Sequence, residues 1–280
     1  MATLAENRYG KSQVRLARVK RHADRNEFQE WTVQILLRGD FETSFTEGDN
    51  SKVLPTDTMK NTVYSVARNS KTACVEAFAM ELIDFLLGRN TQVSQAEVSV
   101  AEKSWEPLKV SGSPHPTAFE QTSGEIQTTK VSRARGAKFS VVSGLDNLVI
   151  LKTADSAFEG YVRDSLTTLP ETSDRLLGTS LCANWTYGVA DLDFCTKRKA
   201  IREILLGTFA AHRSNSVQHT LYAMAEAVLK SVPEVEDVAL AMPNKHYLLA
   251  DLSRFGQDNP NEIFVPTAEP HGYIEARICR

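Results

Sequence analysis

The residues best suited to chemistry are polar side chains that stand at the edges of otherwise apolar segments. Lys11 follows Tyr9-Gly10 at the start of an alternating segment, and Thr56-Asp57 follows a proline where a helix can begin. Asn244-Lys245-His246 lies between two apolar stretches. An amine, a hydroxyl and an imidazole brought together could carry protons to and from a bound ligand.

Each of these residues, taken singly, also has an ordinary structural explanation. Lys11 fits a surface lysine, and Thr56 or Asp57 fits the N-cap of a helix. The segment 244–246 fits a turn, with His246 as a structural histidine. The segments carry a functional meaning only in combination.

Several common catalytic motifs are missing from the sequence. It contains no G-x-G-x-x-G, G-x-x-x-x-G-K-[ST], H-E-x-x-H or G-x-S-x-G pattern, which removes the simplest support for nucleotide cofactors, P-loop chemistry, zinc hydrolases and esterases. The six histidines show no metal-ligand spacing, although His212 and His219 lie two helical turns apart. We therefore expect no bound metal.

The composition is that of a folded protein without extended charged tails. Of the 280 residues 42% are hydrophobic and 24% charged, and the net charge is −3, so neither disorder nor a nucleic-acid-binding arm is expected. No apolar run approaches a membrane span. The N-terminal residues lack a secretory pattern, so we expect a cytoplasmic protein in which all four cysteines are reduced thiols.

Alternating and helical patterns then define the elements that must position these residues. In the first half, residues 9–21 and 27–41 predict strands, with Val14, Leu16 and Val19 buried in one and Trp31, Val33 and Ile35 in the other. Residues 43–52 predict a loop, 56–69 and 72–88 predict two helices, and strands resume after residue 90.

The second half repeats this order. Residues 137–153 predict a hairpin that turns at 144–147, and 175–188 predict a further strand. Two helices at 193–212 and 216–231 precede several short strands. Because strands and helix pairs are segregated, the pattern predicts an α+β fold with antiparallel sheets, divided into residues 1–136 and 137–280.

Six segments together resemble the urate oxidase (uricase) family, both in their residues and in their order along the chain. They span about Tyr9 to Ala276, and three of them are specific on their own: TDTMKNTVY, SLTTLPETSDR and PNKHY. The others are YGKSQVRLARVKR, SVQHTLYAMAE and NPNEIFVPTAEPHGYIEA.

This resemblance implies two tandem T-fold (tunnelling-fold) domains whose sheets close into barrels when subunits assemble. The implied assembly is a homotetramer with active sites at subunit interfaces. The implied reaction is the cofactor-free oxidation of urate by O2 to 5-hydroxyisourate and hydrogen peroxide.

The resemblance also assigns residues that bind a flat, anionic purine. Phe158 would stack on the ring, and Leu169 would pack against its plane. Arg175 would grip one edge with its planar fork of donors. Val217 and Gln218, in the first turn of a helix, would hold the opposite edge.

The catalytic group implied by the family is a lysine–threonine pair with a histidine, which matches Lys11, Thr56 and His246. Lys11 and Thr56 would come from the neighbouring subunit. Asn244 would hold the water or oxygen site, and the backbone amide of Asp57 would contact the purine.

Two other hypotheses remain open. The chain could be a non-catalytic purine-binding relative, which would need Phe158, Arg175 and Gln218 but not the Lys11–Thr56–His246 group. It could instead be a zinc-dependent T-fold enzyme, which would need a compact Cys/His/Glu site that the sequence does not display. The residues 99–125 are less typical of the family, and the peroxisomal C-terminal tripeptide of eukaryotic members is missing.

Overall fold

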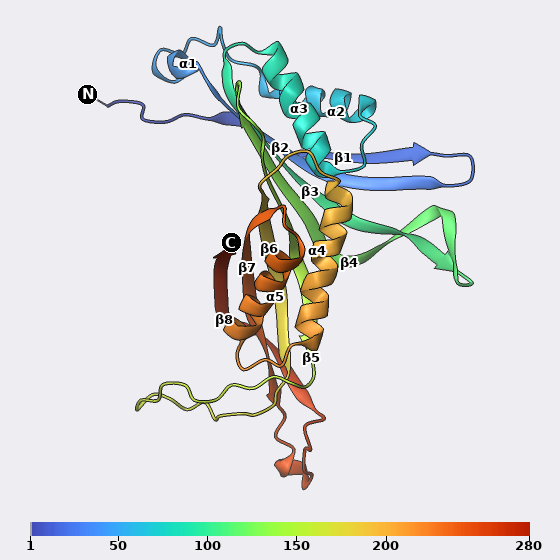
Figure 1. Ribbon diagram of the computed structural model, residues 1–280, viewed down its shortest axis with the longest axis vertical. Coiled ribbons are helices and arrows are strands. Elements are labelled where there is room, and N and C mark those ends of the chain that lie inside the picture. The colour runs from blue at the N-terminus through green and yellow to red at the C-terminus, as the bar shows by residue number, and fades with distance from the viewer. Residues whose placement is uncertain (1) are drawn as a thin grey trace. The chain divides into compact units, whose positions relative to one another are not determined.

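The computed structural model describes residues 2–280, apart from the side chain of Ala268. The chain forms two compact units. The first comprises the chain through Gly144 together with Thr186–Arg198, and the second comprises Leu145–Trp185 and Lys199–Arg280. Both contain antiparallel strand pairs and helices, which confirms the predicted α+β class (Figure 1).

Four strands and three helices make up most of the first unit. The strands β1 to β4 follow one another in the sheet and pair antiparallel. Helix α2 contacts β1, and α3 contacts β3 and β4 (Figure 1). The bounds are β1 Tyr9–Arg21, β2 Asn26–Gly39, α1 Glu42–Thr46, α2 Thr56–Asn69, α3 Val75–Arg89, β3 Val93–Val110 and β4 Ser113–Ala134.

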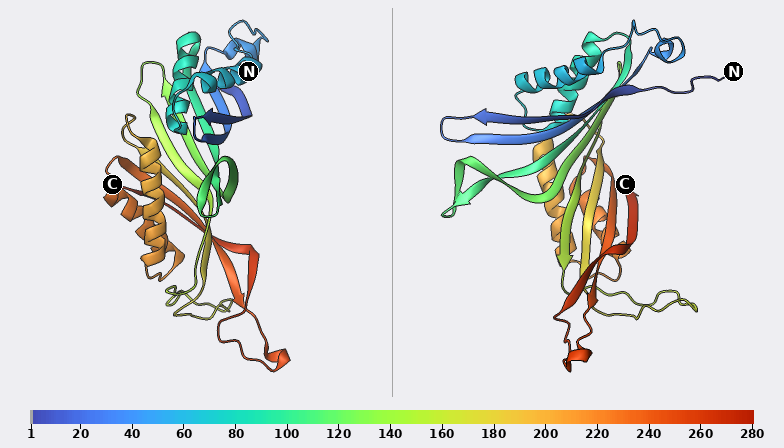
Figure 2. Two further views of the ribbon diagram at one scale, coloured as in Figure 1. Left: turned by 90° about the vertical axis from the view of Figure 1, so that its right-hand side faces the viewer. Right: turned by 180° about the vertical axis from the view of Figure 1, so that it is seen from behind.

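The second unit holds most of the remaining elements. The strands β5 to β8 again follow one another, and β7 pairs antiparallel with β8. Helix α5 packs on β7 and β8, and α4 runs beside α5 (Figure 2). The bounds are β5 Ser140–Lys152, β6 Leu177–Tyr187, α4 Phe194–Ala211, α5 Val217–Ser231, β7 Val235–Leu249, the 3-10 turn Ser253–Phe255 and β8 Phe264–Cys279.

The helical stripes expected from the sequence form the core. Most of their predicted apolar residues are fully or nearly fully buried, although Ile204 in α4 is only partly buried. The buried ones are Met59, Val63, Val66 and Ala67 in α2, Phe78, Leu82 and Leu86 in α3, Ile201, Leu205 and Phe209 in α4, and Leu221, Met224 and Val228 in α5. In β2 the alternate residues Trp31, Val33 and Ile35 are buried as expected. The 3.6-residue and two-residue periods therefore identified the buried faces correctly.

Other expectations are wrong in detail. Val19 is 41% exposed because it lies three residues after Leu16, an odd spacing that places it on the opposite face of β1 from Val14 and Leu16. Residues 144–147 do not form a turn, since β5 is one continuous strand in which Asn147 takes a left-handed backbone conformation at φ 56°. The short helix α1, Glu42–Thr46, covers the first part of the expected loop 43–52.

The terminal strands are long rather than short. Asn244-Lys245-His246 lies inside β7 instead of in a turn. Helix α2 also lacks the predicted cap, since its N-cap residue is Pro55 and no side chain caps it.

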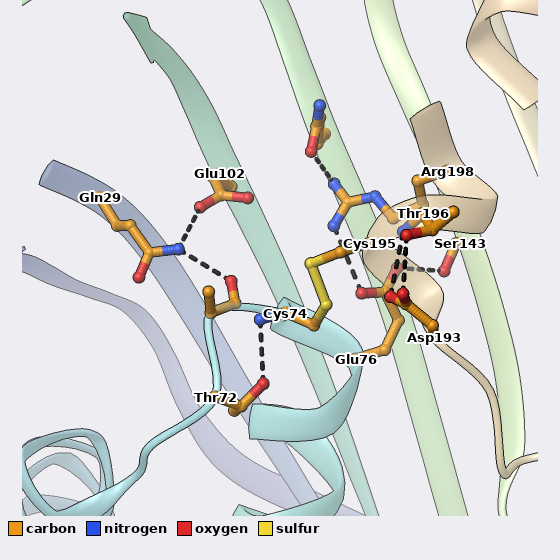
Figure 3. The surroundings of a disulfide bond; sticks show 12 residues. Gln29, Thr72, Cys74, Glu76, Glu102, Ser143, Asp193, Cys195, Thr196 and Arg198 are labelled. Carbon is orange, nitrogen blue, oxygen red and sulfur yellow. Dashed lines mark hydrogen bonds and ion pairs between the residues drawn. A yellow bond between two sulfur atoms is a disulfide. The ribbon is translucent and has the colours of Figure 1, made fainter. Parts of the chain in front are cut away.

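The cysteines correct a further expectation. Cys74 and Cys195 form a disulfide across 121 residues of sequence, with 5.6 Å between their Cα atoms (Figure 3). Cys182 and Cys279 are free. Cys74 immediately precedes α3, and Cys195 lies in the first turn of α4. The fold brings these two helix starts together, which the spacing of the cysteines in the sequence cannot reveal.

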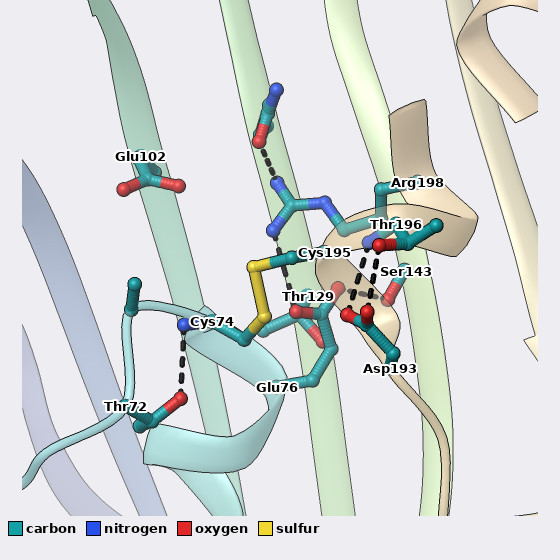
Figure 4. A network of polar contacts seen from close by, with 12 residues as sticks. Thr72, Cys74, Glu76, Glu102, Thr129, Ser143, Asp193, Cys195, Thr196 and Arg198 are labelled. Atoms are coloured by element: carbon teal, nitrogen blue, oxygen red, sulfur yellow. Dashed lines mark hydrogen bonds and ion pairs between the residues drawn. A yellow bond between two sulfur atoms is a disulfide. The ribbon is translucent and has the colours of Figure 1, made fainter. Parts of the chain in front are cut away.

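A buried polar network lies beside this disulfide (Figure 4). The Arg198 guanidinium lies 3.3 Å from a Glu76 carboxylate oxygen and donates to Gln127, and Ser143 donates to the other Glu76 oxygen at 2.6 Å. Glu76 is completely buried and Arg198 is 5% exposed. A buried carboxylate requires such partners, since an unpaired charge there is strongly destabilising.

Candidate functional site

A cavity of about 460 Å³ in the second unit gathers five of the residues singled out in the sequence. Phe158, Leu169, Arg175, Asn244 and His246 all line it. They come from a long loop between β5 and β6 and from β7. The volume falls within the range that small-molecule sites occupy.

Phe158 and Arg175 are fixed beside one another by backbone pairing. Phe158 and Thr172 exchange backbone hydrogen bonds of 2.8 and 3.2 Å. The Asp174 carboxylate accepts from the backbone N–H of Ser156 at 3.1 Å. These hydrogen bonds hold the backbone of the segment before Phe158 beside that of the segment before Arg175.

The Arg175 guanidinium lies beside the Phe158 ring and has a buried N–H group that is available to a ligand. Its central carbon lies 5.2 Å from the centre of the Phe158 ring, a cation–π distance. Burial lowers the pKa of Arg175 from its ordinary value. Within the described part of the chain its buried Nε has no hydrogen-bond partner. A buried donor without a partner is costly, so this group is suited to an anionic or carbonyl acceptor.

Strand β7 supplies six consecutive residues to the cavity, from Asn244 to Leu249, and its pairing with β8 is irregular within this run. The register with β8 shifts between Asn244 and His246, so the usual alternation of faces is interrupted, and Lys245 lines the cavity as well. The ring of Tyr247 packs against Gly178 of β6, where a Cβ atom would lie 2.8 Å from it. Glycine at position 178 therefore allows the Tyr247 ring of β7 to pack directly against the backbone of β6.

Val217 and Gln218 are placed differently. They open α5, which Ser216 caps by accepting from the backbone N–H of His219. An isolated bridge between Ser156 and Ser214 brings this helix start next to the Phe158 segment. Gln218 itself lines a second cavity with Leu221 and Tyr222, so the structure does not join its side chain to the first cavity.

Lys11, Thr56 and Asp57 belong to the first unit. Lys11 pairs with Ile35 just before the irregularity in β1, and Thr56 and Asp57 open α2. The pKa of Asp57 is held below its ordinary value, chiefly by a hydrogen bond from Lys60 and to a smaller extent by the charge of Lys11. Lys11 is therefore within electrostatic range of the first turn of α2.

The sequence analysis assigned no role to four residues around these positions. Tyr161 stacks on Phe158 with 4.8 Å between ring centres and 17° between planes. Asp174 ties the two binding segments, Lys245 lines the cavity, and Tyr9 bonds to Leu54 ahead of α2. Tyr161 and Asp174 stand within three residues of assigned positions, but only the fold shows what they contact.

No metal centre is evident in the described residues. They contain no group of three or more His, Cys, Asp or Glu side chains that could hold an ion. His212 and His219 do meet, edge to face, with 4.4 Å between ring centres. Within residues 2–280, no helix combines the length and the apolar character that crossing a membrane requires.

Comparison with known proteins defines the class to which this fold and cavity belong. The family model for uricase matches residues 7–132 and 141–275. The chain is similar to the uricase of Arthrobacter globiformis, with 39% identity over 99% of this chain and 90% of that protein. It is also similar to the uricase of Dictyostelium discoideum, with 39% identity over 100% of this chain and 98% of that protein.

The solved structures agree with the sequences. The crystal structure of the Arthrobacter globiformis uricase superposes with a TM-score of 0.94 at 38% identity, covering 100% of this chain and 96% of that one. A urate oxidase from Bacillus sp. TB-90, 23% identical, shares the fold with a TM-score of 0.85 over 98% of this chain and 100% of its own. The chain belongs to the uricase family, and the resemblance seen in the sequence is confirmed.

Proposed function

We propose that this protein oxidises urate with O2 and water to 5-hydroxyisourate and hydrogen peroxide. Urate loses two electrons to O2, its C5 gains a hydroxyl from water, and the protons released complete the peroxide. The observation that best supports this proposal is the cavity in which Phe158 and the unpartnered Arg175 Nε lie side by side. Membership of the uricase family supports urate as the substrate that binds in this cavity.

Binding depends on the shape and charge of the purine. The Phe158 ring offers a flat apolar face to a flat heterocycle, and Leu169 closes the site beside it. Arg175 donates to a ring nitrogen and a carbonyl oxygen of the anion, as a planar guanidinium can and a point charge cannot. Val217 and Gln218 hold the opposite edge, where a helix N-terminus favours an anion.

Proton movement is assigned to Lys11, Thr56 and His246. The lysine exchanges a proton through the threonine hydroxyl with a water above the ring, and His246 completes the relay. Asn244 holds that water or the dioxygen. The backbone amide of Asp57 contacts the purine. The electron-rich urate supplies both electrons, so no cofactor is expected.

We propose that two protomers form this site together. Lys11, Thr56 and Asp57 belong to one unit, whereas the cavity residues belong to the other. We assign the first group to a neighbouring protomer within a homotetramer of tandem T-fold domains, whose sheets close into a barrel. Closure of sheets between protomers also removes exposed strand edges. The domain division near residue 136 and the cytoplasmic location stay predictions.

The test compares turnover with binding. In air-saturated buffer containing a chelator, the wild-type protein should consume urate, measured by loss of its ultraviolet absorbance, and release peroxide. Lys11→Ala and Thr56→Ala should lower kcat by about 100-fold or more, as loss of general acid–base catalysis does. Their anaerobic Kd for urate should change much less. A wild-type kcat in either variant would contradict the relay.

A further inference from the structure

The hydroxyl of Tyr9 links the segments that carry Lys11 and Thr56. It accepts a hydrogen bond from the backbone N–H of Leu54 at 2.8 Å and donates to the carbonyl oxygen of the same residue at 3.2 Å. Tyr9 stands two residues before Lys11 in β1, and Leu54 stands two residues before Thr56 at the start of α2. One side chain thus joins the strand to the helix start.

The ring of Tyr9 is held as firmly as its hydroxyl. It meets the completely buried Phe41 edge to face, with 4.7 Å between ring centres and 87° between planes. Burial raises the pKa of Tyr9 above its ordinary value. The hydroxyl therefore stays neutral in the working pH range and can both donate and accept.

The strand is also constrained between Tyr9 and Lys11. A Cβ atom at Gly10 would lie 1.8 Å from the carbonyl oxygen of Ile35, so β1 and β2 approach closely only because this residue is glycine. Lys11 pairs with Ile35, and the register shifts directly afterwards. Lys11 is therefore attached to a backbone that is fixed by β2 on one side and by Tyr9 on the other.

We propose that Tyr9 is a positioning residue for the Lys11–Thr56 pair, and that its hydroxyl sets the distance between the strand and the start of α2. The inference rests on the proposed function of that pair. Tyr9 takes no part in proton transfer, because both of its hydrogen bonds go to the backbone of Leu54. Loss of the hydroxyl would let the amine and the threonine hydroxyl drift apart, and small misplacements cost catalysis heavily.

The experiment uses Tyr9→Phe, which keeps the ring on Phe41 and removes both hydrogen bonds. We expect kcat to fall by about tenfold or more, while the anaerobic Kd for urate stays within about twofold because Phe158 and Arg175 are untouched. The matched control is Phe41→Leu, which weakens the packing against the Tyr9 ring but leaves the hydrogen bonds of the Tyr9 hydroxyl to Leu54. It should lower the unfolding temperature while kcat stays within about twofold of wild type.

A double-mutant cycle separates positioning from general damage. In a Thr56→Ala background, Tyr9→Phe should change kcat little, because the group it positions is already missing. An undiminished loss of kcat in that background would overturn the proposal. A Tyr9→Phe variant with wild-type kcat would also overturn it. The same holds if Tyr9→Phe and Phe41→Leu lower the unfolding temperature equally and also lower kcat equally.

Two further measurements test the proposal independently of how well Tyr9→Phe folds. Amide hydrogen exchange in the wild-type protein should be slow at Leu54, and exchange at the unprotected rate would overturn the proposal even if Tyr9→Phe failed to fold. If Lys11→Ala and Thr56→Ala keep wild-type kcat, the proposed relay itself is wrong. If they lose activity and Tyr9→Phe does not, only the positioning role of Tyr9 is wrong.

Discussion

At the scale of single residues, the cavity in the second unit is defined by one aromatic ring and one guanidinium. Phe158 and Arg175 lie 5.2 Å apart, measured from the ring centre to the guanidinium carbon. Backbone hydrogen bonds between Phe158 and Thr172 hold together the two segments that carry these side chains. The pair is therefore arranged before a ligand arrives, which lowers the entropic cost of binding.

Arg175→Lys should weaken urate binding. A lysine keeps the positive charge but cannot reproduce two parallel hydrogen bonds. Because a hydrogen bond to a charged group contributes about 1.5–3 kcal/mol, we expect the anaerobic Kd to rise by about tenfold or more. Equilibrium dialysis with urate under nitrogen measures this, and an unchanged Kd would contradict the assignment of Arg175.

Tyr161 should support binding from outside the cavity. It stacks on Phe158 and donates to the Leu169 carbonyl oxygen, and it is not among the described residues that line the cavity. Tyr161→Leu should raise the anaerobic Kd for urate by about two- to tenfold, which corresponds to one lost aromatic pair. Tyr161→Phe, which keeps the ring, should bind almost as well as wild type. Equal losses in both variants would show that stacking is not the cause.

At the scale of elements, periodicity predicted which faces are buried but not where strands end. The stripes of α2, α3, α4 and α5 are buried as expected. In contrast, residues 144–147 contain glycine and asparagine, which favour turns, yet β5 continues through them with Asn147 in a left-handed conformation. Pairing with neighbouring strands overrides the local turn preference, and the sequence alone does not display that pairing.

The candidate site also contains some residues that the sequence predicted and others that only the fold shows. The sequence and its family resemblance named Phe158, Leu169, Arg175, Asn244 and His246, which line the cavity, but they also named Val217 and Gln218, which do not. They did not identify Tyr9, Tyr161 or Asp174, because the role of each depends on contacts with a distant or folded-back segment. The cysteine pair 74 and 195 was missed for the same reason.

The disulfide should be detectable by thiol titration. Denatured protein that has not been reduced should show two reactive thiols, from Cys182 and Cys279, and reduction should expose four. Because the bond closes a long loop in the unfolded chain, Cys195→Ser should lower the free energy of unfolding by about 2–5 kcal/mol. Cys279→Ser, at an exposed free cysteine, should leave it nearly unchanged. Four reactive thiols before reduction would contradict the disulfide.

At the scale of the whole molecule, the proposed function requires residues that lie in different units. Phe158, Arg175, Asn244 and His246 lie in the second unit, and Lys11, Thr56 and Asp57 lie in the first. We assign the two groups of one active site to two protomers. A monomer would then carry both groups yet complete no site.

Co-expression of two inactive variants tests this claim most directly. Lys11→Ala and Arg175→Ala, each expressed alone, should oxidise urate very slowly. When the two chains assemble together at random in equal amounts, about a quarter of the shared sites should receive both an intact Lys11 and an intact Arg175. The purified mixture should then regain about a quarter of the wild-type rate, whereas homo-oligomers mixed after assembly should not. Activity no greater than the sum of the two separate variants would contradict a site shared between protomers.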